Sequence, residues 1–253
     1  MAEENLFTYA GIFRLLADTA RKIAIFPIRD WSGQPGIILR HDVDLDVEPA
    51  LRFAHREAAA GLRASFFFLT TAETYNVSGA NCRAMLREID HLGMEVGLHF
   101  DPTIHGGIGP EEMEAAARRE AAILEDIIGR EVRSISLHNP SISGLYPLFP
   151  GWRNAYDPAI FSPDRYLSDS RMTFQSDPAS FFADAAHQTY QLLLHPLHYS
   201  NDGVGYPTPM TDYVIRSALK VDAIFQVNST YAGQVGGRFL HRLAEALANR
   251  VSR

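Results

Sequence analysis

The sequence predicts an α/β fold with a mostly parallel sheet and an added helix near its N-terminus. Short apolar runs recur along the chain, and helical spacing of apolar residues fills most of the segments between them. This alternation is typical of parallel β/α architecture, in which each crossover between neighbouring strands is usually a helix. The runs predicted as strands are GIILRH at 36–41, ASFFFL at 64–69, MEVGLHF at 94–100, VRSISLH at 132–138 and YQLLLH at 190–195.

Length and composition favour one folded domain. The chain has 253 residues, a length that allows one large α/β barrel or two small domains. Apolar residues make up 46% of it and charged residues 21%, which is enough hydrophobic surface for a full core. No Pro/Gly/Ser-rich linker and no internal repeat divides the sequence. We therefore predict a single domain over residues 1–253.

Three helices can be placed from their spacing and their ends. The N-terminal helix is expected over about 4–22, and Pro27 ends its pattern. Asp46 can cap a helix that follows the first strand, because an aspartate side chain accepts hydrogen bonds from the first free N–H groups. A third helix is expected over 110–128, since it opens with proline and acidic residues and ends at Gly129.

The stretch 141–159 has the composition of a loop. It is rich in proline, glycine and aromatic residues. A long loop inside a compact domain is more often functional than accidental, so we expect this segment to shape a binding site.

Charge and cysteine content restrict partners and location. Thirty acidic and 23 basic residues give a net charge of −7, so the basic surface usual for nucleic-acid binding is not expected. The single cysteine, Cys82, cannot form an intramolecular disulfide, which fits a reducing compartment. The acidic start of the chain does not resemble a signal peptide, and no apolar run reaches the roughly 18 residues of a membrane span. We therefore expect a cytoplasmic protein with no membrane span.

Aspartate and histidine side chains stand at the ends of four predicted strands. The carboxyl ends of parallel strands form one face, where ligands and catalytic residues collect. A single histidine there is more often structural, but four strands that deliver such groups to one face point to a site. Mixed nitrogen and oxygen donors suit zinc or a similar divalent ion. The residues are Asp42 and Asp44 after the first strand, then His99, His138 and His195.

These motifs resemble the polysaccharide deacetylases with a NodB-type domain, carbohydrate esterase family four. The resemblance covers about residues 35–200. It implies a distorted (β/α) barrel of mostly parallel strands, a divalent metal with Zn²⁺ favoured, and removal of an N-acetyl group from a sugar. The subgroup that it resembles is associated with bacterial surface-polysaccharide or lipopolysaccharide biosynthesis. The motifs are ILRHDVD at 38–44, GMEVGLH at 93–99, HNP at 138–140 and LLLH at 192–195.

The resemblance implies a role for each matching residue. Asp42 matches the general base and His195 the general acid, while Asp44 and His99 match metal ligands. Asp169 matches the acidic residue that orients the catalytic histidine, although an aspartate that caps a loop is an equally good interpretation.

The third metal ligand departs from the family pattern. The family's second metal histidine lies four residues after the first, where this chain has Thr103. His105 lies six residues after His99, and His138 stands where the family has an arginine. We favour His138 as the third ligand and keep His105 as the alternative.

The predicted function is hydrolysis of an N-acyl group, in particular an N-acetyl group, on a sugar or sugar precursor. A lipid-linked or nucleotide-linked sugar would fit a role in surface-polysaccharide biosynthesis. One alternative is a metal-dependent phosphatase, because an Asp-x-Asp pair after an apolar strand also opens such enzymes. The two lysines, Lys22 and Lys220, do not follow predicted strands, as phosphate chemistry would prefer. A metal-dependent glycosyltransferase would leave the strand-end histidines unexplained. A carbohydrate-binding relative without catalytic activity is the third alternative.

Overall fold

The computed structural model describes residues 5–251, which form two compact units, one up to Gly205 and one from Tyr206 onward. The single-domain organisation expected from the sequence stays a prediction. Each unit is described by itself. The candidate site lies in the first.

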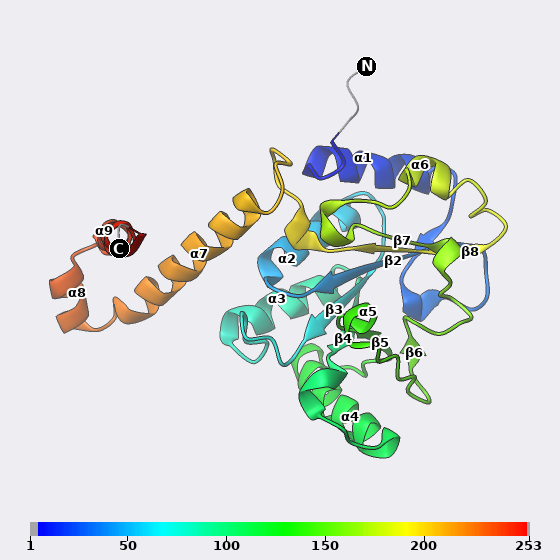
Figure 1. Cartoon of the computed structure of the whole chain (residues 1–253), viewed down its shortest axis with the longest axis horizontal. Coiled ribbons are helices and arrows are strands. Elements are labelled where there is room, and N and C mark those ends of the chain that lie inside the picture. The colour runs from blue at the N-terminus through cyan, green and yellow to red at the C-terminus, as the bar shows by residue number, and fades with distance from the viewer. Residues whose placement is uncertain (1–4, 252–253) are drawn as a thin grey trace. The chain divides into compact units, whose positions relative to one another are not determined.

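The first unit is built on one curled sheet, an open half-barrel (Figure 1). Every strand pairing in the described part of the chain is parallel, which confirms the predicted α/β class. The strand order is β6-β5-β4-β3-β2-β8-β7, and β1 also pairs with β2. The strands are β1 (Ile25–Phe26), β2 (Gly36–Val43), β3 (Ser65–Leu69), β4 (Glu95–Phe100), β5 (Ser134–Leu137), β6 (Arg153–Asn154), β7 (Tyr166–Ser168) and β8 (Thr189–Leu194).

The five strands predicted from apolar runs are confirmed to within two residues of their ends. Strand β2 is buried along its whole length, as a central strand of a parallel sheet should be. The strands that the sequence did not predict are β1, β6 and β7, which are two or three residues long. Such short strands carry too few residues to show a periodicity.

Helices connect successive strands. Helices α2, α3 and α4 contact one another in that order along one side of the sheet (Figure 1). The α-helices of the first unit are α1 (Tyr9–Ala20), α2 (Val47–Ala59), α3 (Ala80–His91), α4 (Pro110–Ile128), α5 (Pro140–Ser143) and α6 (Pro178–Phe181). Its 3-10 helices are η1 (Ile28–Asp30), η2 (Pro102–His105), η3 (Pro163–Arg165), η4 (Ser170–Met172) and η5 (Pro196–His198).

The ends of these helices agree with the chemistry read from the sequence. The Asp46 side chain accepts a hydrogen bond from the N–H of Glu48 and caps α2. Gly129 adopts a left-handed conformation after α4, with φ of 72°, where a side chain would add strain. The expected N-terminal helix begins at Tyr9 rather than at residue 4, which lies outside the described residues, because Thr8 caps it through the N–H of Gly11.

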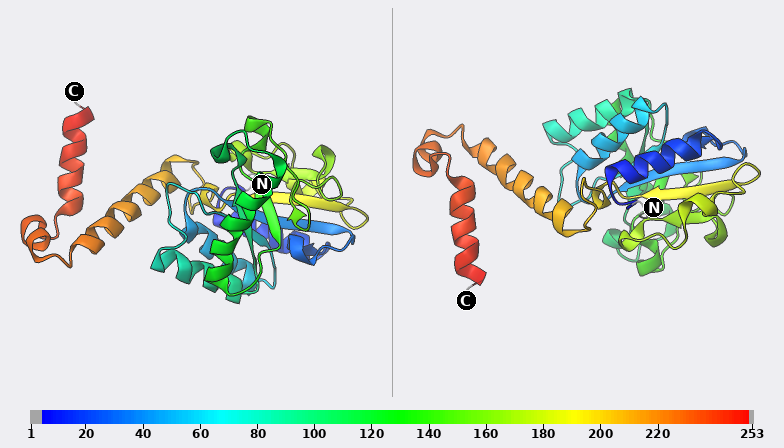
Figure 2. Two further views of the ribbon diagram at one scale, coloured as in Figure 1. Left: turned by 90° about the horizontal axis from the view of Figure 1, so that it is seen from below. Right: turned by 90° about the horizontal axis from the view of Figure 1, so that it is seen from above.

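The second unit consists of helices α7 (Pro207–Phe225), α8 (Ser229–Val235) and α9 (Phe239–Val251), coloured orange to red in Figure 2. Within residues 5–251, no helix combines the length and the apolar character needed to cross a membrane.

The register of the sheet brings the strand ends of the first unit together. His41 of β2 lies opposite Leu194 of β8, one residue before His195. His99 of β4 lies opposite Ser136 of β5, two residues before His138. The polar residues that follow these strands therefore share one edge of the sheet.

Candidate metal centre and catalytic site

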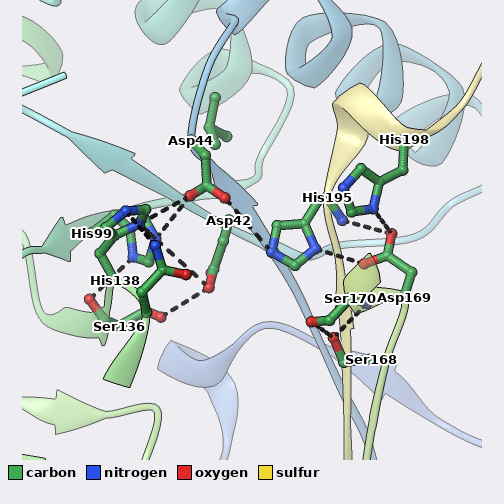
Figure 3. Close-up of polar contacts among 12 residues, drawn as sticks. Asp42, Asp44, His99, Ser136, His138, Ser168, Asp169, Ser170, His195 and His198 are labelled. Atoms are coloured by element: carbon green, nitrogen blue, oxygen red, sulfur yellow. Dashed lines mark hydrogen bonds and ion pairs between the residues drawn. The ribbon is translucent and has the colours of Figure 1, made fainter. Parts of the chain in front are cut away.

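Three side chains at this edge present donor atoms to a common point (Figure 3). Asp44 Oδ1 lies 3.0 Å from His99 Nε2 and 3.4 Å from His138 Nδ1. The two histidine nitrogens lie 3.3 Å apart. The structure thus brings together the three residues that the sequence analysis proposed as metal ligands.

Three different elements supply these donors. Asp44 lies in the turn between β2 and α2, His99 is in β4, and His138 directly follows β5. The backbone N–H of His138 donates to the carbonyl of Phe100 at 2.8 Å. This bond extends the pairing of β4 and β5 by one step, so the two imidazoles are held on adjacent strands.

Hydrogen bonds set which nitrogen of each imidazole faces the common point. His99 Nδ1 lies 3.2 Å from the carbonyl oxygen of Ser136 and donates its proton there, which leaves the Nε2 lone pair toward Asp44. The side-chain amide of Asn139 lies 2.8 Å from His138 Nε2. The amide nitrogen makes this contact and donates to Nε2. With the amide turned by 180°, its oxygen would instead accept a proton from Nε2 and leave Nδ1 free to bind a metal.

The donor set fits a zinc-like ion. Four ligands at about 2.0–2.1 Å from a tetrahedral zinc are separated from one another by roughly 3.3 Å. The three separations of 3.0, 3.3 and 3.4 Å match that value. Burial would raise the pKa of Asp44, but the contacts with His138 and His99 and the charge of His195 hold it well below its ordinary range, so the carboxylate is ionised. Two imidazoles and one carboxylate leave a fourth position for water or substrate.

Asp42 is a buried carboxylate beside this triad. Its Oδ2 accepts from the Ser136 hydroxyl at 3.2 Å and from the Arg40 guanidinium at 3.4 Å, and it lies 3.9 Å from His99 Nε2. Its Oδ1 is buried and has no hydrogen-bond partner among residues 5–251. Since buried carboxylate oxygens are nearly always hydrogen-bonded, this oxygen is suited to accept a proton from a group that enters the site.

The Arg40 guanidinium is itself fully buried and donates to the Tyr156 hydroxyl at 2.9 Å. Burial alone would lower the pKa of Arg40, but Asp42 and the nearby tyrosines raise it above its ordinary value. Arg40 therefore stays charged and forms a buried ion pair with Asp42.

His195 and Asp169 form a dyad on the other side of Asp44. His195 Nδ1 lies 2.6 Å from Asp169 Oδ1, and the backbone N–H of His195 donates to Oδ2 at 2.8 Å. His195 Nε2 points toward the site and lies 3.8 Å from Asp44 Oδ2 (Figure 3). Burial lowers the pKa of His195, but the charge and hydrogen bond of Asp169 outweigh it and raise the pKa to about 9.

Asp169 is fully buried and holds a second imidazole, with His198 Nδ1 at 3.4 Å from its Oδ2. Burial would raise the pKa of Asp169, but His195 and His198 hold it far below its ordinary value. The side chain makes no hydrogen bond that caps η4, so the alternative of a loop-capping aspartate is not supported. Asp169, His195 and His198 also form a second group of possible metal donors. The short Asp169–His195 contact is nevertheless typical of a carboxylate that orients an imidazole.

A cavity of about 460 Å³ is lined by the triad, by Asp42 and by His195 of the dyad. One part of its wall is aromatic, and the other is polar. The aromatic residues are Tyr146, Tyr156, Phe161 and Tyr166, and the polar ones besides those described above are Asn139, Ser141, Ser168, Ser170, Arg171, Thr173 and Gln175. Part of this wall comes from the stretch 141–159 that we expected to shape a binding site.

His105, the alternative third ligand, has another partner. Its Nε2 lies 2.8 Å from Glu120 Oε1, and its ring stacks on Phe100 with the centroids 5.2 Å apart. The other oxygen of Glu120 accepts from the hydroxyl of Thr70. The structure therefore places His138, and not His105, beside Asp44 and His99.

The sequence analysis missed Ser136, whose carbonyl oxygen contacts His99 and whose hydroxyl contacts Asp42. A signal was available, because Ser136 precedes His138 by two residues on a strand and so faces the same side. The sequence analysis also gave no role to His198, and the signal for the contact of His198 with Asp169 is its spacing of three residues from His195.

Comparisons with known proteins find similarity to solved structures only. No protein-family model matches the chain, and no curated protein sequence matches it. Solved structures do match. The Xyl-CE4 domain of a multidomain xylanase from the hindgut metagenome of Trinervitermes trinervoides is 15% identical, with a TM-score of 0.46, over 73% of this chain and 84% of that one.

Two further matches are enzymes by their descriptions. A family 4 acetyl xylan esterase from Clostridium thermocellum, in complex with a cobalt ion, is 14% identical with a TM-score of 0.41, over 73% of this chain and 83% of that one. The chitin deacetylase of Colletotrichum lindemuthianum is 17% identical with a TM-score of 0.43, over 72% and 83% of the two chains. Because these identities and TM-scores are low, the chemistry below rests on the residues of this chain.

Proposed function

We propose that the chain is a metal-dependent hydrolase that removes an N-acyl group, in the simplest case N-acetyl, from a sugar. The observation that carries the proposal is the arrangement of three groups on one cavity. A triad of metal-donor atoms lies beside both an unsatisfied carboxylate, Asp42, and an oriented imidazole, His195. Amide hydrolysis needs these three functions together.

Asp44, His99 and His138 would hold the metal, for which Zn²⁺ is the best fit to the donors. When bound, such an ion supplies a water whose pKa is lowered to about 7 and an electrophile for the acyl oxygen. All other functions fall to the side chains around it.

Asp42 is the proton acceptor of the proposed reaction. Its free Oδ1 is available to take a proton from the attacking water, while Ser136 and Arg40 hold Oδ2 in place. The neighbouring guanidinium places a positive charge beside this carboxylate.

His195 is the proton donor. An amide nitrogen leaves as an amine only when it is protonated, because the nitrogen anion is too basic to leave at neutral pH. Asp169 binds His195 Nδ1 and favours the imidazolium, so the Nε2 proton faces the cavity. In the proposed reaction His195 therefore gives a proton to the leaving amine, and Asp42 takes a proton from the attacking water.

The substrate that we propose is an N-acylated carbohydrate. Flat aromatic side chains beside polar groups, as in the wall of this cavity, suit a sugar ring, which has one apolar face and hydroxyls at its edge. A sugar precursor of bacterial surface polysaccharide, processed in the cytoplasm, is the context that the sequence motifs suggest. That context belongs to the proposal.

Two alternatives have less support. A binding protein without activity would not need the free carboxylate oxygen of Asp42 or the dyad. A phosphatase would be expected to place fixed cations around the phosphate, whereas Arg171 is the one lysine or arginine among the described residues that line the cavity.

The test is acetate release. Protein reconstituted with Zn²⁺ is incubated with a panel of N-acetylated sugars and small oligosaccharides, and free acetate is measured enzymatically. We expect release that chelation with EDTA abolishes and added Zn²⁺ restores. A complete absence of released acid over the panel, together with phosphate release from sugar phosphates, would refute the proposal in favour of the phosphatase.

A further inference from the structure

A second hollow lies next to the catalytic cavity in the first unit. It has a volume of about 580 Å³ and is bounded by the first residue of η2, the first turns of α4 and the segment that follows α5. Its lining is mostly apolar, and its two charged residues are Glu111 and Glu114. We refer to it as the apolar groove. Its other lining residues are Pro102, Ile108, Pro110, Met113, Gly144, Leu145, Tyr146, Pro147, Leu148, Phe149 and Pro150.

The groove and the catalytic cavity share a wall. Residues 138–141 line the cavity, residues 144–150 line the groove, and Tyr146 lines both. The Tyr146 ring meets the ring of Tyr156 edge-on, with the centroids 5.7 Å apart, and Tyr156 belongs to the cavity wall. One continuous segment thus begins at a metal-donor residue and ends in the groove.

Apolar side chains in the groove are open to solvent. Leu145 is 44% exposed, Tyr146 48% and Leu148 48%. Apolar side chains that gather in one exposed hollow mark a binding site far more often than scattered ones do. An apolar occupant would remove these side chains from water and so gain free energy.

Charge at the groove restricts the occupant. Glu111 and Glu114 would repel a carboxylate or a phosphate placed beside them. A neutral hydrocarbon chain meets no such penalty. The groove therefore fits the uncharged part of an amphipathic molecule, with the polar part in the catalytic cavity.

We propose that the apolar groove binds the hydrocarbon chain of a glycolipid substrate whose N-acylated sugar occupies the catalytic cavity. This inference rests on the proposed function and narrows its substrate class. Continuity at Tyr146 favours one molecule that occupies both spaces over a separate partner, because the chain would leave the sugar at the shared wall.

The test compares methyl and octyl β-glycosides of N-acetylglucosamine, both below the micelle-forming concentration of the octyl compound, with Zn²⁺-loaded protein. A fully buried methylene contributes about 0.8 kcal/mol, roughly a fourfold change in affinity, and a half-buried one about twofold. Seven additional methylenes should then lower KM by roughly 100-fold. Because the chain binds equally in the ground and transition states, kcat should stay nearly constant.

Two variants locate the effect. Leu148→Gln places an amide in the groove and should reduce the octyl advantage in KM by about fivefold. Ile142→Gln is the matched control, because Ile142 lies in the same segment and is 82% exposed but does not line the groove. That variant should keep the full octyl advantage.

The outcomes separate the two proposals. Acetate release from both glycosides with equal KM, or an octyl advantage that Leu148→Gln leaves intact, overturns the groove as a chain site and leaves the deacylase standing. A calorimetric titration with octyl β-glucoside, which has no amide to hydrolyse, measures chain binding without turnover and should show binding that Leu148→Gln weakens. If instead Leu148→Gln converts a dimer to a monomer and octyl β-glucoside does not bind, the groove is an interface between two copies.

Discussion

Replacement of His138 by alanine tests the metal site most directly. The side chain supplies one of the three donor atoms, at 3.4 Å from Asp44 Oδ1 and 3.3 Å from His99 Nε2. His138→Ala removes that donor and leaves two. His105→Ala is the matched control, because it removes an imidazole that the structure pairs with Glu120 instead.

His138→Ala should reduce Zn²⁺ affinity by more than the loss of a residue that only orients a metal ligand. Residues that only orient a ligand change metal affinity by about 10- to 100-fold, so loss of a ligand itself should weaken Zn²⁺ binding by more than about 100-fold. At a Zn²⁺ concentration near 1,000 times the wild-type Kd, bound metal stabilises the fold by about 4.1 kcal/mol. After a 100-fold loss the same concentration is about ten times Kd and contributes only about 1.4 kcal/mol.

Competition with a chromophoric chelator gives the affinity, and urea unfolding with and without Zn²⁺ gives the stabilisation. In EDTA, His138→Ala and the wild type should unfold at similar urea concentrations, because the His138 side chain is partly exposed and its loss leaves no large cavity. Equal Zn²⁺ affinity in His138→Ala and the wild type would refute the assignment. A large loss in His105→Ala alone would transfer the role to His105.

Three further changes test the remaining parts of the site and the core. Asp42→Asn should keep Zn²⁺ affinity within about tenfold and lower kcat by about 10²- to 10⁴-fold in the acetate assay, because it removes the proton acceptor and keeps the shape. Asp169→Asn should move the basic limb of the kcat/KM profile to lower pH. The general acid His195 must be protonated, and although burial lowers its pKa, Asp169 raises it from 6.5 to about 9. Without the charge of Asp169, activity at pH 8 should therefore fall more than activity at pH 6. An unchanged basic limb would contradict the dyad. Glu57→Ala should lower the free energy of unfolding in urea by about 3–5 kcal/mol, because this carboxylate is fully buried against a histidine. Glu88→Ala removes a half-exposed ion pair of the same kind and should cost less than about 1 kcal/mol.

The long strands, and the polar residues that end them, could be predicted from the sequence alone. Strand β2 shows why, since its apolar run is continuous and ends in charged residues, a pattern that a buried parallel strand produces and a surface segment does not. The carboxyl ends of parallel strands meet at one edge whatever the details of the helices. Asp42, Asp44 and His99 could therefore be assigned to one site before any geometry was known.

The choice between His138 and His105 could not be made from spacing alone. His105 follows β4, which carries His99, and His138 follows the adjacent strand β5. Either position could therefore bring an imidazole near His99. The decision depends on side-chain partners far away in the chain: Glu120 of α4 reaches back to His105 at 2.8 Å, and the spacing around residue 105 does not reveal that contact. The apolar groove was equally hidden, because its walls come from η2, α4 and the segment after α5.

The position of the third donor has a consequence for the metal site. A histidine four residues after His99 would lie in η2. Thr103 occupies this position, and its N–H and hydroxyl both donate to the Asp101 carboxylate. His138 follows β5 directly, and its backbone N–H is bonded to Phe100 of β4. The donors on His99 and His138 are consequently fixed by the register of two adjacent strands, which can adjust little. Asp44, in contrast, lies in a turn, and its side chain is 38% exposed. Because the strand register holds the imidazoles in place, the binding energy of a metal would not be needed to order them. Adjustment of the proposed site to different ions would then fall mainly to Asp44.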